Sequence, residues 1–286
     1  MIITNNYNLP KVLIDSVEEN HTPVDKHYSV TTLLKPIREI LLTRRHYAEI
    51  EQDISDMVWL IFGSAVHKLI EDSDKTGFAE FKLEELVIND YYLTGIVDLY
   101  DEEHSLINDW KTATVYKILN KDFEDWRKQG LMYAWLLRKK GYHVGKLQFH
   151  AMLKDWSHKD SRIKSDYPQH PLYTWEYEIT ESDMQEIESF IRTQLKLLIA
   201  CEKLSDNELP ECSQEERWNP GDKYAVMKSG RKTAIKVCDS KKEAESFIAG
   251  SDMFIETRPG EDKKCNDYCI CKKFCSYWRS KNEESN

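Results

Sequence analysis

The stretch GIVDLYDEEHSLINDWKTA, residues 95–113, contains two runs of β-favouring residues on either side of a polar turn. If the turn is centred between Glu103 and His104, an antiparallel hairpin pairs residues whose numbers sum to 207. Asp98 then lies directly opposite Asp109. We therefore predict a hairpin in which two carboxylates face each other across one pair of strands.

Two facing carboxylates destabilise a strand pair, and burying them costs several kcal/mol more unless a cation neutralises them. Their hard oxygen atoms suit Mg²⁺ or Mn²⁺. Lys111 follows Asp109 by two residues, so both side chains point to the same face of the strand. Lys111 is then placed to hold an attacking water and to stabilise charge on a phosphate. Gly95 is expected to let backbone or nucleic acid approach closely.

The flanking sequence predicts an α/β fold. The residues from Phe78 to Thr112 favour three antiparallel strands, and residues 147–156 and 173–180 favour two more. Apolar spacing predicts four helices, at 29–46, 58–71, 123–142 and 181–204. We expect helix 58–71 to be almost completely buried because it is so apolar. Gly141 is the expected stop of helix 123–142.

Composition limits the function. The net charge of −10 argues against a protein that coats nucleic acid by bulk electrostatics, although a local basic track would still allow DNA as a substrate. Residues 44–46 (RRH) and 228–232 (KSGRK) are candidate tracks.

No cysteine precedes Cys201, no apolar run is long enough for a membrane helix, and no leader is evident at the start. We expect a cytoplasmic protein, in a bacterium or a phage-infected host cell.

Three motifs together resemble those of the PD-(D/E)XK nuclease superfamily, in its RecB-like exonuclease branch. Asp98 followed by Asp109-Trp110-Lys111 is similar to the catalytic motif, GSAVH (63–67) to the histidine helix, and QGLMY (129–133) to the Gln-x-x-x-Tyr helix. The resemblance implies a restriction-endonuclease-like core, a mixed central sheet flanked by helices. It implies the catalytic residues Asp98, Asp109, Lys111, Gln129 and Tyr133, and the metal ligands His67, Asp98 and Asp109.

The same resemblance implies a Mg²⁺- or Mn²⁺-dependent deoxyribonuclease, and within the branch an exonuclease of DNA recombination, repair or phage DNA processing. Single- or double-stranded DNA is the implied substrate, with a recombinase, a helicase or a single-strand-binding protein as an accompanying partner. Glu80 is a further candidate acid, in competition with Glu84 and Glu85. The alternative function is a catalytically inactive DNA-binding or assembly subunit that retains the nuclease fold.

Composition changes after Pro210, so we expect a nuclease core over residues 1–205 and a cysteine-rich module over 206–286 that closes onto it. KYAVMKSGRKTAIKV (223–237) predicts a hairpin inserted in this module. Dense cysteines in an intracellular chain indicate a metal site, and Cys201 and Cys238 are read as ordinary buried thiols.

The C-terminal cysteines resemble the branch's 4Fe-4S motif, which is commonly spaced C-x2-C-x5-C. Here the spacing is C-x3-C-x5-C, over Cys265, Cys269 and Cys275. The resemblance implies a 4Fe-4S cluster, with Zn²⁺ as the alternative. Cys212 is the expected fourth ligand and Cys271 is its competitor.

Overall fold

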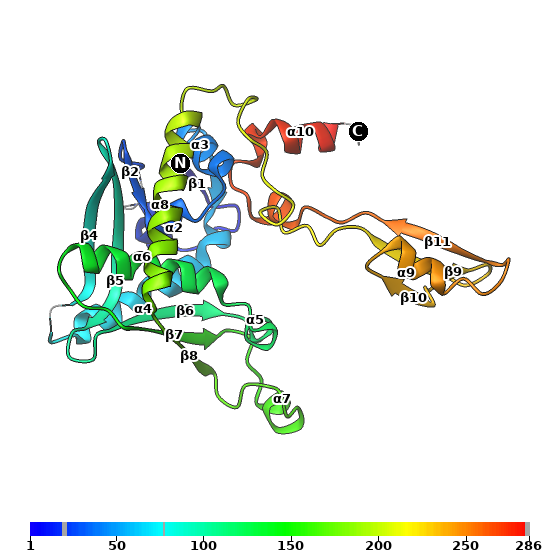
Figure 1. Ribbon diagram of the computed structural model, residues 1–286, viewed down its shortest axis with the longest axis horizontal. Coiled ribbons are helices and arrows are strands. Elements are labelled where there is room, and N and C mark those ends of the chain that lie inside the picture. Colours follow the sequence, from blue (N-terminus) through cyan, green and yellow to red (C-terminus); the bar gives the residue numbers. More distant parts are fainter. Residues whose placement is uncertain (19–21, 77, 284–286) are drawn as a thin grey trace. The chain divides into compact units, whose positions relative to one another are not determined.

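The computed structural model describes residues 1–18, 22–76 and 78–283, shown in Figure 1. It divides into two compact units, Met1–Lys203 and Leu204–Asn286, which we describe separately. Among the described helices, none is both long and apolar enough to cross a membrane.

A six-stranded mixed sheet forms the centre of unit Met1–Lys203. The strand order is β2-β5-β6-β7-β8, and β4 pairs with β5. The β5–β6, β4–β5 and β7–β8 pairs are antiparallel, whereas β2–β5 and β6–β7 are parallel. This confirms the predicted α/β class and each predicted strand, and Figure 1 shows β6, β7 and β8 side by side. The bounds are β2 (His27–Ser29), β4 (Ala79–Ile88), β5 (Tyr91–Asp101), β6 (Leu106–Ala113), β7 (Lys146–Leu153) and β8 (Leu172–Glu178).

Eight α-helices flank this sheet in the described part of the unit. The helices predicted at 123–142 and 181–204 are confirmed as α6 (Glu124–Lys139) and α8 (Glu181–Cys201), and Gly141 follows α6 with a φ of 91°. The others are α1 (Lys11–Glu18), α2 (Val30–Leu33), α3 (Ile37–Arg45), α4 (Val58–Ser73), α5 (Val115–Asn120) and α7 (His158–Ile163). A short parallel pair, β1 (Ile2–Thr4) and β3 (Glu51–Asp53), lies outside the central sheet, and a 3-10 turn (Ile54–Met57) precedes α4.

The single helix predicted over 29–46 is wrong. Pro36 lacks an amide hydrogen and disfavours helical geometry in the residue before it, so the segment splits into α2 and α3 with Pro36 at the start of the second helix. The predicted cap at the beginning is present, because Ser29 Oγ accepts the amide hydrogen of Thr32 at 3.1 Å.

The helix predicted over 58–71 is confirmed as α4, but the prediction that it is almost completely buried is wrong. None of the sixteen described residues of α4 is fully buried. Its large apolar side chains are instead exposed by 44% to 67%, at Val58, Trp59, Leu60, Phe62 and Leu69. Apolar content alone cannot distinguish a helix that is covered by its own chain from one whose apolar face is exposed.

Helix α6 packs tightly on the sheet through its glycine. A Cβ atom at Gly130 would lie 2.7 Å from Leu147 Cδ1 and 2.8 Å from Phe149 Cζ, so only glycine allows this approach to β7. The neighbouring Gln129 is therefore held close to the sheet. On its other side α6 is tied to α8 by an ion pair between Arg127 Nη2 and Asp183 Oδ1 at 2.7 Å.

Unit Leu204–Asn286 contains a small antiparallel sheet of order β10-β9-β11. The predicted hairpin is confirmed as β9 (Lys223–Lys228) and β10 (Lys236–Cys238), whereas β11 (Met253–Arg258) and α9 (Lys241–Ser246) were not predicted. Cys238 is buried with Val226 and Ala244 in the core of this sheet, as expected of an ordinary thiol. A π-turn (Lys264–Tyr268), a 3-10 turn (Lys272–Phe274) and α10 (Ser276–Glu283) follow.

Asp262 joins the segments on either side of this small sheet. Its carboxylate accepts hydrogen bonds from Arg217 Nε at 3.0 Å, from Asn219 Nδ2 at 2.7 Å and from Tyr277 Oη at 2.7 Å. Residues before β9 are thus fastened to residues after β11. The cysteine-bearing segments are brought together in spite of the insertion between them.

Candidate active site

The β5–β6 hairpin has the predicted register but a shorter ladder. Leu99 pairs with Asn108, Tyr100 with Ile107 and Asp101 with Leu106, and each pair sums to 207 as expected. The ladder ends there, so Asp98 and Asp109 do not form the ladder pair that we predicted. Asp98 Oδ2 instead accepts the backbone amide hydrogen of Trp110 at 2.7 Å.

One edge of β5 pairs with two neighbours and leaves residues 95–98 between them, where β5 and β6 separate. β4 occupies the whole of one edge, while on the other edge β2 pairs with residues 92–94 and β6 with residues 99–101. Burial along β5 also changes phase between Val97 and Asp98, which are both buried. Asp98 is therefore buried although it does not continue the alternation that buries Gly95 and Val97.

Asp98 is a buried acid whose charged form is disfavoured. Burial, followed by the negative charge of Asp109, raises the pKa of Asp98 to about 7, although His67 and Lys111 favour its ionised form. The predicted conflict between two carboxylates is therefore present, even without a ladder pair.

Asp109 and Lys111 share one face of β6, as predicted. Lys111 Nζ lies 2.7 Å from Asp109 Oδ2, as an ion pair without the angles of a hydrogen bond. Asp109 is 1% exposed, and neither of its carboxylate oxygens accepts a hydrogen bond from any residue that the structure describes. The ion pair with Lys111 offsets part of the cost of burying this carboxylate, and a further cation would offset more, since its oxygens accept no hydrogen bond.

Lys111 is also connected to helix α6. Lys111 Nζ donates to Gln129 Oε1 at 2.9 Å, and Gln129 Nε2 donates to Tyr133 Oη at 3.0 Å. Burial raises the pKa of the Tyr133 hydroxyl far above its usual value, so this group stays protonated. The predicted pair on one helix face thus forms a hydrogen-bonded chain that ends on the lysine.

Gly95 has a different role from the one we predicted. A Cβ atom there would lie 2.9 Å from Leu136 Cδ1 and 3.0 Å from Tyr133 Cε1. The close approach that Gly95 allows is therefore that of α6, which brings Tyr133 to the site, and not that of a nucleic acid.

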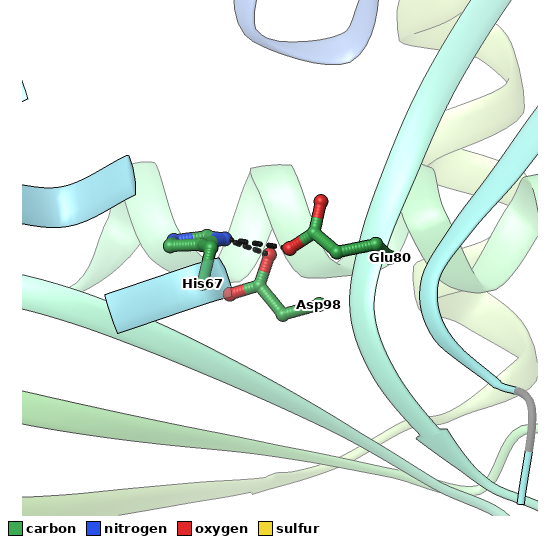
Figure 2. A group of neighbouring side chains, drawn as sticks. All are labelled: His67, Glu80 and Asp98. Atoms are coloured by element: carbon green, nitrogen blue, oxygen red, sulfur yellow. Dashed lines mark hydrogen bonds and ion pairs between the residues drawn. The ribbon is translucent and has the colours of Figure 1, made fainter. Parts of the chain in front are cut away.

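His67 from α4 completes the group with two acids. His67 Nδ1 lies 3.0 Å from Glu80 Oε1 and 3.3 Å from Asp98 Oδ1, as Figure 2 shows. One ligand atom from each of these three residues lies within 4.8 Å of the others, a spacing that could hold a metal ion. The hydrogen bond to Glu80 raises the pKa of His67, which is a direction expected of a histidine among acids in the absence of metal.

Glu80 is the further acid that we named as a candidate, in competition with Glu84 and Glu85, and it lies beside His67. It lies across β4–β5 from Asp98, between the pairs Ala79–Leu99 and Phe81–Val97, and its φ of 47° is in the left-handed region. Seven described non-glycine residues have a positive φ, and Glu80 is the one of them that lines the candidate site. Its two competitors are used elsewhere, in ion pairs of Glu84 with His27 and of Glu85 with Lys140.

His67, Glu80, Asp98, Lys111, Gln129 and Tyr133 line a cleft of about 820 Å³, whereas Asp109 and Gly95 are not among its lining residues. Lys68 and Lys82 add positive charge to it, and Trp59, Leu60 and Ile96 add apolar surface. The remaining lining residues are Thr31, Gly63, Ser64, Val66, Glu71, Trp110, Thr112 and Met152.

The basic track predicted at 44–46 is used for structural contacts. The Arg44 guanidinium lies 4.4 Å from the centre of the Tyr28 ring and donates to the carbonyl of His27 at 3.1 Å. Arg45 Nη2 donates to the carbonyl of Glu202 at 3.0 Å. This cluster therefore fastens α3 to neighbouring segments. The second cluster, 228–232, lies at the turn after β9 in the other unit.

Comparisons with known proteins leave the family open. No family model matches the chain, and no curated protein matches it. Among solved structures, it is similar to that of SSO0001, with a TM-score of 0.47 and 16% identity over 68% of this chain and 87% of the other. A phage-related exonuclease from Haemophilus somnus 129PT gives a TM-score of 0.29 and 18% identity, over 48% of this chain and 70% of the other. Both scores are below 0.5, so we argue the function from the residues of the site.

Proposed function

We propose that this chain is a metal-dependent DNA nuclease of the PD-(D/E)XK superfamily, in its RecB-like branch, and that it acts as an exonuclease. The observation that carries the proposal is the buried carboxylate of Asp109, whose oxygens accept no hydrogen bond from any described residue and lie beside a second buried acid and a lysine. Two buried acids beside a single lysine leave an excess of negative charge, which destabilises the fold. A bound metal ion would neutralise this charge and could also contact a substrate phosphate.

The donor set fits a hard divalent ion. Asp98 and Asp109 would hold Mg²⁺ or Mn²⁺, with His67 as an additional ligand, and Glu80 adds a carboxylate beside His67. Such an ion, when bound, activates water and stabilises charge on a phosphoryl oxygen. Burial of the two aspartates keeps bulk water from screening them.

The chain's own residues would position the reacting groups. Lys111, held by Asp109 and Gln129, presents an ammonium to the attacking water and to the scissile phosphate. Gln129 in turn is oriented by Tyr133. The positive charge of Lys111 thus stays at one place while the charge on the phosphate grows.

Cleavage of end-labelled DNA tests this proposal. We expect Mg²⁺ or Mn²⁺ to support release of nucleotides from an end, EDTA to abolish it, and renewed metal to restore it. The order of product sizes gives the polarity, and matched single and double strands give the preference. A metal-loaded protein that binds DNA but does not cut it would instead favour the non-catalytic DNA-binding or assembly subunit. In that case a recombinase, helicase or single-strand-binding protein would be the partner to seek.

We further propose that Cys212, Cys265, Cys269 and Cys275 hold a 4Fe-4S cluster, with Zn²⁺ as the alternative. Burial is the main reason that the pKa of Cys212 rises to about 12, and nearby Glu216 and the thiols of Cys265, Cys275 and Cys269 raise it further. Thiols at such a pKa ionise only when a metal binds them, since the thiolate is the ligand.

Absorption of the anaerobically purified chain tests the cluster. We expect a broad band near roughly 400 nm that is lost in Cys212→Ser. Cys271→Ser is the matched control, because Cys271 Sγ lies only 3.5 Å from Cys269 Sγ and is the competing ligand. A colourless protein containing zinc would establish the alternative metal. Loss of the band only in Cys271→Ser would show that the fourth ligand is Cys271 and not Cys212.

A further inference from the structure

Helix α4 exposes apolar surface directly beside the candidate active site. Trp59 and Leu60 line the same cleft as His67, and their exposed fractions are 48% and 49%. An apolar helix is normally covered, and an exposed apolar patch at the edge of a polar cleft marks a binding surface. The occupant has to combine an apolar face with negative charge, because Lys154 Nζ lies 4.5 Å from the centre of the Trp59 ring.

Gly63 gives a second and independent indication. It occupies the interior of α4, where glycine is about 1 kcal/mol less favourable than alanine. A Cβ atom at Gly63 would meet no atom of the described residues within 4 Å, in contrast to Gly95 and Gly130, whose Cβ atoms would clash. Packing within the chain therefore does not explain Gly63. It lies in the cleft one turn before His67, where a missing side chain leaves room for a ligand against the helix.

We propose that a single DNA strand runs along α4 to the metal site, with an unpaired base stacked on Trp59 and the strand passing over Gly63. This inference rests on the proposed nuclease function and names its substrate class. Eight residues separate Trp59 from His67, which is about 12 Å along a helix. At about 3.4 Å per stacked nucleotide, that distance spans three to four nucleotides.

The neighbouring charges fit such a strand. Lys154 over Trp59, Lys82 on β4 and Lys68 on α4 provide cations for phosphates. Lys68 is partly neutralised by Glu71 and Asp72, so Lys154 and Lys82 are the expected phosphate contacts. Stacking on an exposed indole beside a cation is the way in which proteins bind unpaired bases irrespective of sequence. Duplex ends would need to fray before a base could reach Trp59.

Binding of labelled oligothymidylate in EDTA tests the proposal without cleavage. We expect Trp59→Ala to weaken single-strand binding about 5- to 100-fold and Trp59→Phe to recover part of the loss, with binding of a closed duplex hairpin unchanged. Leu69→Ala is the matched control, since Leu69 is 67% exposed on α4 but does not line the cleft. An abasic site at one position should weaken wild-type binding and leave Trp59→Ala unaffected.

Gly63→Ala separates a binding role from a structural one. We expect the melting temperature to rise, because alanine favours the helix and its Cβ meets no atom, while single-strand affinity falls. Unchanged single-strand affinity in Trp59→Ala or in Gly63→Ala would overturn the proposal, as would equal loss on the closed duplex. Because these measurements need no catalysis, a chain that binds as expected but cuts nothing would overturn the nuclease function alone.

Discussion

Lys111→Ala is expected to lower the cleavage rate about 10³-fold at saturating DNA and metal, with little change in DNA affinity. The ammonium contacts Asp109 and Gln129 in the free protein, and its positive charge also favours the ionised form of Asp98. Loss of one preorganised group that stabilises transition-state charge typically reduces the rate by about 10²- to 10³-fold. Single-turnover cleavage of end-labelled DNA in Mn²⁺ measures this step directly.

Lys82→Ala is the matched control for Lys111→Ala. Lys82 lines the same cleft from β4, and we place it only near the phosphates, so its loss should weaken binding and leave the saturated rate nearly unchanged. Far-ultraviolet circular dichroism checks that both variants are folded. A Lys111→Ala protein that cuts at the wild-type rate would show that Lys111 has no part in catalysis. The proposed metal site would then rest on the remaining residues.

The hairpin could be predicted because its determinants are local. The polar turn fixes the centre, and alternation on either side fixes which residues share a face, so three pairs summing to 207 follow. The same reasoning placed Asp109 and Lys111 on one face of β6. It could not place Asp98, because the hairpin pattern does not show where the β5–β6 ladder ends, and residues 95–98 of β5 pair with neither β6 nor β2.

Glu80 and α4 show the two limits of sequence reasoning at this site. Glu80, Glu84 and Glu85 are equivalent by pattern, and only the left-handed backbone at Glu80 and the ion pairs of the other two distinguish them. Helix α4 has the apolar content of a buried element, yet its apolar face borders a cleft. In both places the outcome depends on how distant segments of the chain pack, which a local pattern does not contain.

Asp98→Asn is expected to make the metal-free protein more stable at pH 8 and to abolish cleavage. Asparagine keeps the oxygen that accepts the Trp110 amide hydrogen and removes a charge that burial and Asp109 disfavour. The variant loses the attraction of His67, but the pKa of Asp98 is raised to about 7 in spite of that attraction, so the unfavourable effects are larger. One pKa unit corresponds to about 1.4 kcal/mol, and we expect a gain of at least about this size.

The dependence on pH and on metal makes this stability difference diagnostic of a metal site. A carboxyl with a raised folded pKa stabilises the fold while it is protonated, and this contribution is lost as the pH rises from about 4 through about 7. The advantage of Asp98→Asn in EDTA should therefore be small at pH 4 and full at pH 8. Saturating Mn²⁺ should reduce this advantage by up to about 2.7 kcal/mol, because an ion at 100 times its Kd stabilises the wild type by that amount and binds the variant more weakly. Urea unfolding of the full chain at both pH values measures these differences. A variant that is less stable than the wild type in EDTA at pH 8, and unaltered in its response to Mn²⁺, would show that Asp98 is an ordinary structural acid.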